Sequence, residues 1–441
     1  MPGIFDLSLQ LNGYPLKWAK SEIRKIGNIP DEDYAGFVEM RKKAIVDYHF
    51  EHNAFYREIT SATPSKAWND LRVMGKQDFQ RPLAQRLSNG YSAASVFVNK
   101  TSGSSGNPMT FAKDKACHAL IWANIQRRFS WYGVDFNSSW QARFYGRSLD
   151  SVASKKLQLK DYLSKRHRFD IFDLSDVALE KIVGKFATTK FEYLNGYTSN
   201  IVQLAKYLKR KNLVLKAICP TLKVCMTTSE MLFDNDRKLI EEHLGIPVAN
   251  EYGASELEVI AFEHPDGRWL VNAETIFVEI LDDNDEAVPF GKEGRIVVTS
   301  LDNKAHPFIR YDVGDRGILD ESSTAKYPIL KKLIGRTSDF AILPSGKKPA
   351  GMTFYSLTKA IFEDDGNVKE FVIVQREIDL FQINYVSEIE LNAQEQDCIS
   401  RIMTGYLEPG LRFEYHRKSA LERSSAGKLK QFTCLVKQDE A

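Results

Sequence analysis

The sequence predicts an α/β protein with at least two domains. Strand-like and helix-like segments alternate between residues 96 and 256, as they do in α/β units around a mainly parallel sheet. A strand-rich stretch from Trp269 to Leu319 indicates a β-rich subdomain. The chain has 441 residues, of which 43% are hydrophobic and 27% are charged, and this composition is ordinary for a globular protein with more than one core.

The first elements are predicted by their periodicity. Residues 16–62 and 65–88 are expected to be helical, because apolar residues recur in them every three to four positions. VFVNK at 96–100 is expected to be a strand that enters the glycine-rich stretch TSGSSGNP, and the segment after that stretch has helical periodicity up to Gly133. The expected order is therefore strand, glycine loop, helix.

Further α/β units follow. TLKVCMTTSE is expected to be a strand, LFDNDRKLIEEHLG a helix that ends at Gly245, and IPVANEYGASE a strand with a loop. In the β-rich stretch, Glu274–Leu281 and Gly294–Thr299 are expected to be strands joined by the turn DDNDEAVPFGKEG. The strand, helix and strand up to residue 256 extend the parallel sheet, and the two strands between residues 274 and 299 belong to the β-rich subdomain.

The composition disfavours several classes of function. The 60 Lys and Arg residues against 58 Asp and Glu leave a net charge of +2, which provides no global field toward nucleic acid or an anionic membrane. The five cysteines are never spaced as CxxC, which argues against a disulfide framework or a zinc knuckle. No segment resembles a signal peptide, and no apolar run approaches the ~18 residues of a spanning helix. We expect a cytoplasmic protein, a monomer or homodimer, with no nucleic acid or membrane partner.

His49 and His52 are spaced like a metal-binding pair on one helical face. The sequence offers no third ligand near them. The aromatic residues around them are typical of packing, so we expect no structural metal at this position.

The stretch TSGSSGNP, Thr101 to Pro108, is the first candidate for ligand binding. A glycine-rich turn ahead of a helix exposes several backbone N–H groups in one concavity, where phosphate oxygens bind, and Ser and Thr add hydroxyl donors. The P-loop pattern GxxxxGKS/T is absent, since Asn107 follows Gly106 where that pattern requires a lysine. The loop is thus a candidate phosphate site without a kinase-like or GTPase-like motif, and a Ser/Gly linker is the alternative.

Five separate stretches occur in the order and approximate spacing of the core motifs of adenylate-forming enzymes. They are TSGSSGNP, NEYGASE at 250–256, FIRYDVGDRG at 308–317, IGRTSDF at 334–340 and SSAGKLK near the end. On these motifs the chain resembles the acyl- and aryl-CoA ligase superfamily, over about residues 45–435. NAFYRE, LRVMGKQDFQ and PSGKKPAGMTFY look most like the phenylacetate-CoA ligase and CapK branch.

The resemblance implies a two-domain adenylate-forming enzyme. Residues 1–337 would form a large ATP- and acid-binding adenylation domain, with parallel-sheet α/β units and a β-rich subdomain, and residues 338–441 a small mobile α+β domain. Such an enzyme uses ATP and Mg²⁺ to convert a carboxylic acid into acyl-AMP and pyrophosphate, and CoA as co-substrate then accepts the acyl group. The alternatives are transfer to an amine or a hydroxyl, as in an acid-amine ligase, and a nucleotide-binding protein without catalysis.

The resemblance also assigns residues to the nucleotide. The β- and γ-phosphates would be held by Thr101, Ser102, Gly103, Ser104, Ser105 and Gly106. Further nucleotide contacts would come from Ser229, Glu230, Asn250, Glu251, Tyr252 and Gly253. Tyr252 would stack near adenine, Ser255 would touch the α-phosphate, and Glu256 would bind Mg²⁺. Asp315 would accept hydrogen bonds from the ribose hydroxyls, a task for an acceptor-only carboxylate, and Arg336 would lie near ribose and phosphate.

Lys428 is the cation that the resemblance makes most informative. It lies in SSAGKLKQ, and its family counterpart reaches the substrate carboxylate and the α-phosphate during adenylation and is then moved away with the mobile domain. Lys430 competes for this role, and a solvated lysine in a tail is the alternative. The chain departs from the family at the hinge, where Ser338 stands in place of the usual acidic residue or lysine.

The acid would bind at two tyrosine-rich stretches, QARFYGRS and EYLNGYTSN. They lie where the family has its acyl-binding loops, and they supply Tyr145, Gly146, Tyr193, Asn195, Gly196 and Tyr197. A wall of tyrosines suits a planar acid, so we expect an aryl or other small carboxylic acid. Core packing explains the same tyrosines nearly as well.

We predict that the double substitution Gly103→Val and Gly106→Val weakens MgATP binding without unfolding the protein. Two valine side chains would close the concavity in which backbone N–H groups meet phosphate oxygens. Calorimetric titration with MgATP and a thermal melt measure the two quantities. Unchanged affinity in a folded variant would make the loop a linker.

Overall fold

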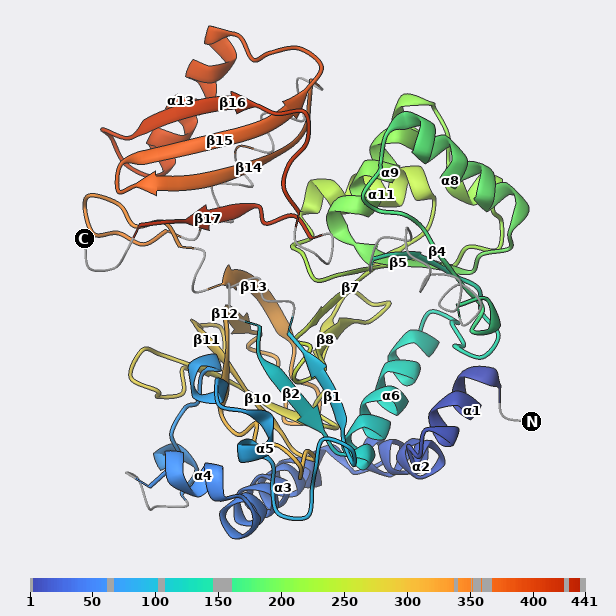
Figure 1. The fold of residues 1–441 in the computed structure, drawn as a ribbon, viewed down its shortest axis with the longest axis vertical. Coiled ribbons are helices and arrows are strands. Elements are labelled where there is room, and N and C mark those ends of the chain that lie inside the picture. Colours follow the sequence, from blue (N-terminus) through green and yellow to red (C-terminus); the bar gives the residue numbers. More distant parts are fainter. Residues whose placement is uncertain are drawn as a thin grey trace. The chain divides into compact units, whose positions relative to one another are not determined.

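The computed structural model describes residues 3–61, 67–101, 108–145, 161–336, 340–349, 351, 358, 367–423 and 428–436. The chain divides into two compact units, Met1–Val313 with Gly317–Lys332, and Gly314–Arg316 with Leu333–Ala441. Figure 1 shows the elements of both units in chain order. The main division, between Lys332 and Leu333, lies close to the predicted domain boundary at 337.

A seven-stranded sheet forms the centre of the first unit, in the order β4-β3-β5-β6-β7-β8-β9. Its parallel strands are β4 (Arg166–Arg168), β3 (Gln141–Phe144), β5 (Tyr193–Tyr197), β6 (Val224–Thr228) and β7 (Val248–Gly253). Two antiparallel strands extend it, β8 (Val259–Glu263) and β9 (Trp269–Val271). Parallel strands need crossover connections, which helices supply here, and the predicted α/β class is confirmed.

Helices cover both faces of this sheet (Figure 1). One face carries α8 (Asp176–Thr188), α9 (Thr198–Arg210), α10 (Leu215–Ile218) and α11 (Asp234–Leu244). The other face carries α1 (Ile4–Leu11), α2 (Leu16–Gly27) and α6 (Lys115–Ser130). Successive residues of a strand point to opposite faces, so Tyr193 enters the second core and Leu194 the first. As predicted, α11 ends at Gly245, whose φ of 70° is left-handed.

The helical prediction for residues 65–88 is wrong. The stretch 16–62 is helical as expected, with α3 (Asp31–His52) and α4 (Ala54–Ile59) after α2. The described part of the next stretch, however, holds only single turns, namely η1 (Trp68–Asp70), η2 (Lys76–Phe79) and α5 (Leu83–Arg86). Gly75 and Pro82 each stand directly before one of these turns, and neither residue favours a continuous helix.

The glycine-rich stretch lies between two strands. β1 (Phe97–Lys100) and β2 (Thr110–Lys113) pair antiparallel, with Lys100 opposite Thr110. Only after β2 does α6 begin, where the Asp114 carboxylate accepts hydrogen bonds from the backbone N–H groups of Ala116 and Cys117. The expected order of strand, loop and helix is therefore corrected to strand, loop, strand and helix, because the TFAK segment is β-forming.

Two four-stranded sheets complete the fold. The first, β10-β11-β12-β13, comprises β10 (Ile276–Leu281), β11 (Glu293–Ser300), β12 (Tyr311–Leu319) and β13 (Leu330–Arg336). β10 and β11 are antiparallel and confirm the two predicted strands. The second, β16-β15-β14-β17, belongs to the second unit with α13 (Ala393–Tyr406). Its strands are β14 (Val368–Glu377), β15 (Leu380–Ser387), β16 (Arg412–Arg417) and β17 (Phe432–Cys434).

Three further expectations concern cysteine, histidine and hydropathy. All five cysteines have free thiols. Among the residues described above, no helix combines the length and the apolar character that a membrane span requires. His49 is fully buried, with Nε2 2.9 Å from the Asn303 carbonyl oxygen and Nδ1 3.3 Å from the Ser88 hydroxyl. It therefore serves the packing of α3, as the sequence suggests.

We predict that acid destabilises the protein partly through His49. Burial lowers the pKa of this imidazole from 6.5 to about 4. Between these values the unfolded chain binds a proton that the folded protein does not, so the contribution of His49 to stability is complete above about pH 6.5 and falls toward pH 4. Relative to the wild type, His49→Gln should reduce the loss of unfolding free energy between neutral pH and pH ~4.5 by roughly 1–3 kcal/mol in urea titrations.

His416→Gln is the control, because its side chain is 42% exposed and it lies on β16 in the second unit. It should change the pH dependence of the unfolding free energy less than His49→Gln does. An equal pH dependence in the wild type and in His49→Gln would show that other groups cause the acid sensitivity.

Candidate functional site

The carboxyl ends of the parallel strands gather many of the predicted site residues at one edge of the sheet. The register pairs Phe144 with Gly196, Gly196 with Thr227, and Thr227 with Asn250. The residues that follow these positions are therefore neighbours across β3, β5, β6 and β7. Ligands of open α/β sheets bind at this edge.

The loop after β6 has an uncommon backbone conformation. Ser229 has a φ of 69°, in the left-handed region that residues with a side chain rarely adopt. The carboxylate of Glu230 accepts a hydrogen bond from the backbone N–H of Ser199 at 2.8 Å, and its carbonyl accepts one from the Thr198 hydroxyl at 3.3 Å. Glu230 thus holds the loop against the first turn of α9, where backbone N–H groups have no helical partner. Such strained positions cluster at functional sites.

At the end of β7, the backbone of Gly253 lies close to the backbone of the following loop. A Cβ atom on Gly253 would lie 2.5 Å from the carbonyl oxygen of Glu258, so only glycine fits there. The Asn250 backbone N–H donates to the Glu263 carboxylate at 2.9 Å, and the Thr228 hydroxyl donates to Glu251 at 2.8 Å. Burial raises the pKa of Glu251, and the Thr228 hydrogen bond opposes that shift.

Tyr252 is nearly buried and packs edge-to-face against Trp269, with ring centroids 6.1 Å apart. β7 pairs with β6 on one side and with β8 on the other. Strand pairing therefore holds the backbone of the NEYG segment up to the loop that carries Ser255 and Glu256.

The loop at 254–258 is fixed by side chains from two other sheets. Lys113, at the end of β2, donates from Nζ to the carbonyl oxygen of Ser255 at 3.0 Å. Tyr311, at the start of β12, donates from its hydroxyl to the Glu256 carboxylate at 3.0 Å. Glu256 is 8% exposed, so one of its oxygens is held while the group keeps slight access to solvent. The β1-β2 hairpin therefore contacts the NEYGASE loop at Ser255, and the FIRYDVGDRG segment contacts it at Glu256.

Lys113 is a residue that sequence reasoning missed. It is 5% exposed, and burial lowers its pKa, while the charges of Cys117, Glu258 and Glu256 oppose that shift. A lysine at the end of a short strand is usually a surface residue, and nothing in the local sequence indicates that its ammonium faces another loop. Lys113 is the last residue of β2, a strand that the sequence prediction did not include.

The two tyrosines at the ends of β3 and β5 lie beside each other. The ring centroids of Tyr145 and Tyr197 are 5.8 Å apart, and burial raises the pKa of Tyr197 to about 12. Between their strands, a Cβ on Gly196 would lie 2.5 Å from Cβ of Phe144, so glycine is required for this approach. The Arg143 guanidinium stacks over the Tyr145 ring at 4.4 Å and donates to its hydroxyl at 2.7 Å.

Tyr193 and Asn195 lie deeper in the sheet than these tyrosines. Tyr193 begins β5, is 2% exposed and packs edge-to-face on Phe129. Asn195 accepts a hydrogen bond from Gln141 at 3.3 Å and donates to the Met226 carbonyl at 3.4 Å. Both side chains contribute to the packing and hydrogen bonding of the sheet.

The remaining predicted residues are spread over both units. Thr101 closes the glycine-rich stretch, since its N–H donates to the Met109 carbonyl and its hydroxyl accepts from the Met109 N–H, both at 2.9 Å. Asp315 lies on β12, four residues after Tyr311. Lys428 is half-buried in the second unit, and Lys430 is exposed. Outside the described side chains are Ser102, Gly103, Ser104, Ser105, Gly106, Gly146, Arg336 and the hinge residue Ser338.

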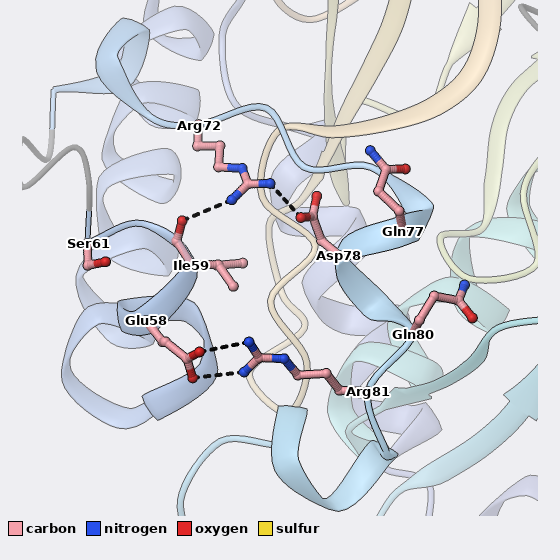
Figure 2. A pocket seen from close by; sticks show the side chains of 8 residues that line it. All are labelled: Glu58, Ile59, Ser61, Arg72, Gln77, Asp78, Gln80 and Arg81. Carbon is pink, nitrogen blue, oxygen red and sulfur yellow. Dashed lines mark hydrogen bonds and ion pairs between the residues drawn. The ribbon is translucent and has the colours of Figure 1, made fainter.

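A separate surface hollow lies near α4, and Figure 2 shows the residues that line it. Its charged groups satisfy one another, since both Arg81 guanidinium nitrogens donate to the Glu58 carboxylate and Arg72 pairs with Asp78. Exposed pairs of this kind contribute little energy and leave no unpaired charge for a ligand. Within the described ranges, no group of three or more His, Cys, Asp or Glu residues is arranged for a metal.

Comparisons with known proteins bear on this arrangement. No protein-family model matches the chain. A phenylacetate-coenzyme A ligase of Pseudomonas putida is 30% identical over 128 residues, which are 28% of this chain and 29% of that enzyme. The match therefore spans less than a third of the relative's length.

The solved structures show the fold more completely. 2-Hydroxyisobutyryl-CoA ligase, solved in the postadenylation state with an acyl-AMP, superposes with a TM-score of 0.71 at 18% identity, over 95% of this chain and 92% of that one. ATP-bound MatB from Rhodopseudomonas palustris gives a TM-score of 0.53 at 15% identity, over 76% of this chain and 65% of that one. The predicted resemblance to adenylate-forming CoA ligases is confirmed, and at these identities it establishes the fold.

We predict that Tyr311→Phe lowers the free energy of unfolding by about 1–3 kcal/mol, because the buried Glu256 carboxylate loses its hydroxyl donor while the ring is retained. Urea denaturation measures this change. Tyr34→Phe is the matched control, since Tyr34 is 1% exposed and lies in a separate core cluster with Ile26 and Val38. A loss of stability no larger than in that control would mean that the Tyr311 hydroxyl does not support Glu256.

Proposed function

We propose that the protein is an ATP-dependent ligase that activates a carboxylic acid as acyl-AMP and transfers the acyl group to CoA. The observation that carries this proposal is that the loop with Ser255 and Glu256 is held by Tyr311 of the FIRYDVGDRG segment and by Lys113 of the β1-β2 hairpin, whose strands flank the glycine-rich stretch. These segments are distant in sequence, and their convergence at the carboxyl edge of a parallel sheet creates the kind of site that holds a nucleotide. The fold shared with CoA ligases supports the same conclusion.

The nucleotide would lie along the ends of β6 and β7. Tyr252 would offer its ring to adenine, and the rigid NEYG backbone would hold the α-phosphate near Ser255. Thr101 at the mouth of the glycine-rich stretch would guide the β- and γ-phosphates, and Asp315 would accept hydrogen bonds from the ribose hydroxyls. ATP-bound MatB, which has a related fold, supports ATP as the nucleotide.

Glu256 fits the coordination of Mg²⁺ in such a site. Magnesium keeps several waters and is usually bound through one or two carboxylates together with substrate phosphates, so a single carboxylate is sufficient. The Tyr311 hydroxyl occupies one carboxylate oxygen and leaves the other for the ion. When bound, Mg²⁺ would neutralise charge on the triphosphate.

The acid would lie beside Tyr145, Gly146, Gly196 and Tyr197, at the ends of β3 and β5. Its carboxylate attacks the α-phosphate, and pyrophosphate leaves as the acyl-phosphate bond forms. The paired tyrosine rings suit an aryl or other largely planar acid. CoA is the proposed acceptor, because the compared enzymes are CoA ligases, and the proposed setting is the cytoplasm.

The family position of Lys428 suggests that it acts only in the adenylating half-reaction. Its ammonium would meet the negative charge that develops at the α-phosphate, and groups of this kind contribute about 3–4 kcal/mol, or roughly 10²- to 10³-fold in rate. Transfer from a preformed acyl-AMP needs no such cation. Lys428→Ala should therefore abolish acid-dependent pyrophosphate exchange and still convert a supplied acyl-AMP with CoA.

Lys430→Ala is the matched control and should keep both half-reactions. Loss of both in Lys428→Ala would indicate a folding defect, and loss of neither would make Lys428 a solvated residue. The exchange assay with a panel of carboxylic acids also tests the proposed function itself. No pyrophosphate exchange with any acid would contradict acid activation. Consumption of acyl-AMP with amines or hydroxylamine, but not with CoA, would show that the acceptor is not CoA.

A further inference from the structure

Three arginines lie on β4 and β3, the outermost strand of the sheet and its neighbour, beside the proposed acid site. The register pairs Arg143 of β3 with Arg168 of β4, and it pairs Gln141 with Arg166. Residues that pair across parallel strands share a face, and positions two apart on a strand share it too. Arg143, Arg166 and Arg168 are therefore on one face of the sheet, next to Asn195 of β5.

This cluster has more positive charge than the described residues around it neutralise. Asp161 is the carboxylate that pairs with the arginines, at 3.5 Å from Arg166 and 3.2 Å from Arg168. Arg143 has no carboxylate partner among the described residues and makes one hydrogen bond there, to the Tyr145 hydroxyl. Three guanidinium groups against one carboxylate leave an excess of two positive charges.

The groups are shielded enough for that excess to matter. The side chains of Arg166 and Arg168 are 15% and 11% exposed, and Asp161 is 6% exposed. The Nε atom of Arg143 is buried and has no hydrogen-bond partner among the described residues. Burial and the neighbouring Arg143 charge lower the pKa of Arg166. A buried donor without a partner is costly, and an anion would satisfy it.

Arg166 and Arg168 have structural duties as well. Arg166 donates to Gln141 at 2.6 Å, and Arg168 donates to the carbonyl oxygen of Tyr145 at 3.2 Å. Arg143 lacks a comparable duty, since its one bond reaches only the tip of Tyr145. Arg143 is therefore the member of the cluster that is available to a ligand.

The cluster stands at a definite separation from the proposed reaction centre. The loop with Ser255 and Glu256 follows β7, and Arg143 lies on β3, three strand spacings away in the same sheet. At about 4.8 Å per spacing, the two places are roughly 14 Å apart across the edge. Tyr197, at the end of β5, lies between these two strands, and Tyr145 directly follows β3, two residues after Arg143.

We propose that the acid substrate carries a second anionic group, roughly 10–15 Å from the carboxylate that is activated, and that Arg143 binds this group with support from Arg166 and Arg168. The inference rests on the proposed function, since it names the substrate class of that same site. The substrate is an elongated dianion whose flat middle part lies against Tyr145 and Tyr197. A planar guanidinium suits a carboxylate, a sulfonate or a phosphate.

Two matched pairs of acids test the proposal in the acid-dependent pyrophosphate-release assay. The long pair is a biphenyl with one carboxylate on each ring against biphenyl monocarboxylate, and the short pair is terephthalate against benzoate. The wild type should prefer the long dianion over its monoanion by roughly 10- to 100-fold in kcat/KM, mainly through KM, because a charged hydrogen bond is gained. The short pair should show no such preference, since terephthalate cannot span the distance.

Arg143→Gln should reduce the long dianion-to-monoanion ratio by roughly 10- to 100-fold, and Arg143→Lys should restore part of it, because the charge returns without the planar fork. Arg210→Gln is the control for loss of one positive charge, since Arg210 is an exposed residue of α9 that pairs with Asp176. It should leave the ratio and the activity unchanged. A thermal melt of each variant identifies a folding defect.

Equal use of the long dianion and its monoanion by the wild type, or an equal loss of both acids in Arg143→Gln, would overturn the inference. Direct calorimetric binding of the long dianion separates this outcome from failure of the proposed function, because it requires no catalysis. If no acid releases pyrophosphate but the dianion binds through Arg143, the activity is wrong and the anion site stands. If pyrophosphate is released but the dianion gains nothing from Arg143, the activity stands and the anion site is wrong.

Discussion

The parallel register of β3, β5, β6 and β7 is the constraint on which the candidate site depends. Each strand ends at the same edge, so Phe144, Gly196, Thr227 and Asn250, which are 52, 31 and 23 positions apart in successive pairs, become neighbours across the sheet. A slip of one residue would turn every side chain of a strand to the opposite face, and the apolar cores on both faces oppose such a slip. The glycines at positions 196 and 253 sharpen this constraint, because a side chain at either would collide with the neighbouring strand or loop. Packing on the two faces therefore determines the geometry at the edge.

The loop after β7 adds an electrostatic condition to this geometric one. It places Glu256 and Glu258 two residues apart, and both are nearly buried. Burial raises the pKa of Glu258 to about 8, and the Lys113 charge opposes that shift. Removal of these two acidic side chains from water is unfavourable without compensation, and the Lys113 charge and the Tyr311 hydroxyl supply part of it. The same compensation joins three sheets of the protein at one place. Glu256, the residue proposed to bind Mg²⁺, is thus held by a contact that also joins β12 to the loop after β7.

Much of the architecture could be predicted from local sequence, and the errors have physical causes. The α/β units, the end of α11 at Gly245 and the β10–β11 pair follow from periodicity and glycine placement. The helix expected at 65–88 failed because apolar spacing was counted across Gly75 and Pro82. The missed strand at Thr110–Lys113 is a four-residue segment, too short to show a period. Lys113 could not be found as a site residue, since its contact with Ser255 joins positions 142 residues apart. Tyr193 was predicted to line the acid site together with Tyr197, whereas in the structure it begins β5 and packs on Phe129 in the core.

The edge of a parallel sheet also imposes a scale on any substrate that lies across it. Strands are spaced by about 4.8 Å, so a ligand that is fixed chemically at the end of β7 meets each further strand at a set distance. Residues on β5 and β3 can then select for shape, as the paired rings of Tyr145 and Tyr197 suit a flat group. Residues on β3 and β4 can select only for what lies at the far end, and here they are arginines with one aspartate between them. The fold is shared with ligases at 18% identity, so the backbone alone does not determine specificity. In the proposed site, specificity would be set by which side chain each strand presents at its place along this edge, and Arg143 contacts both the ring and the hydroxyl of Tyr145.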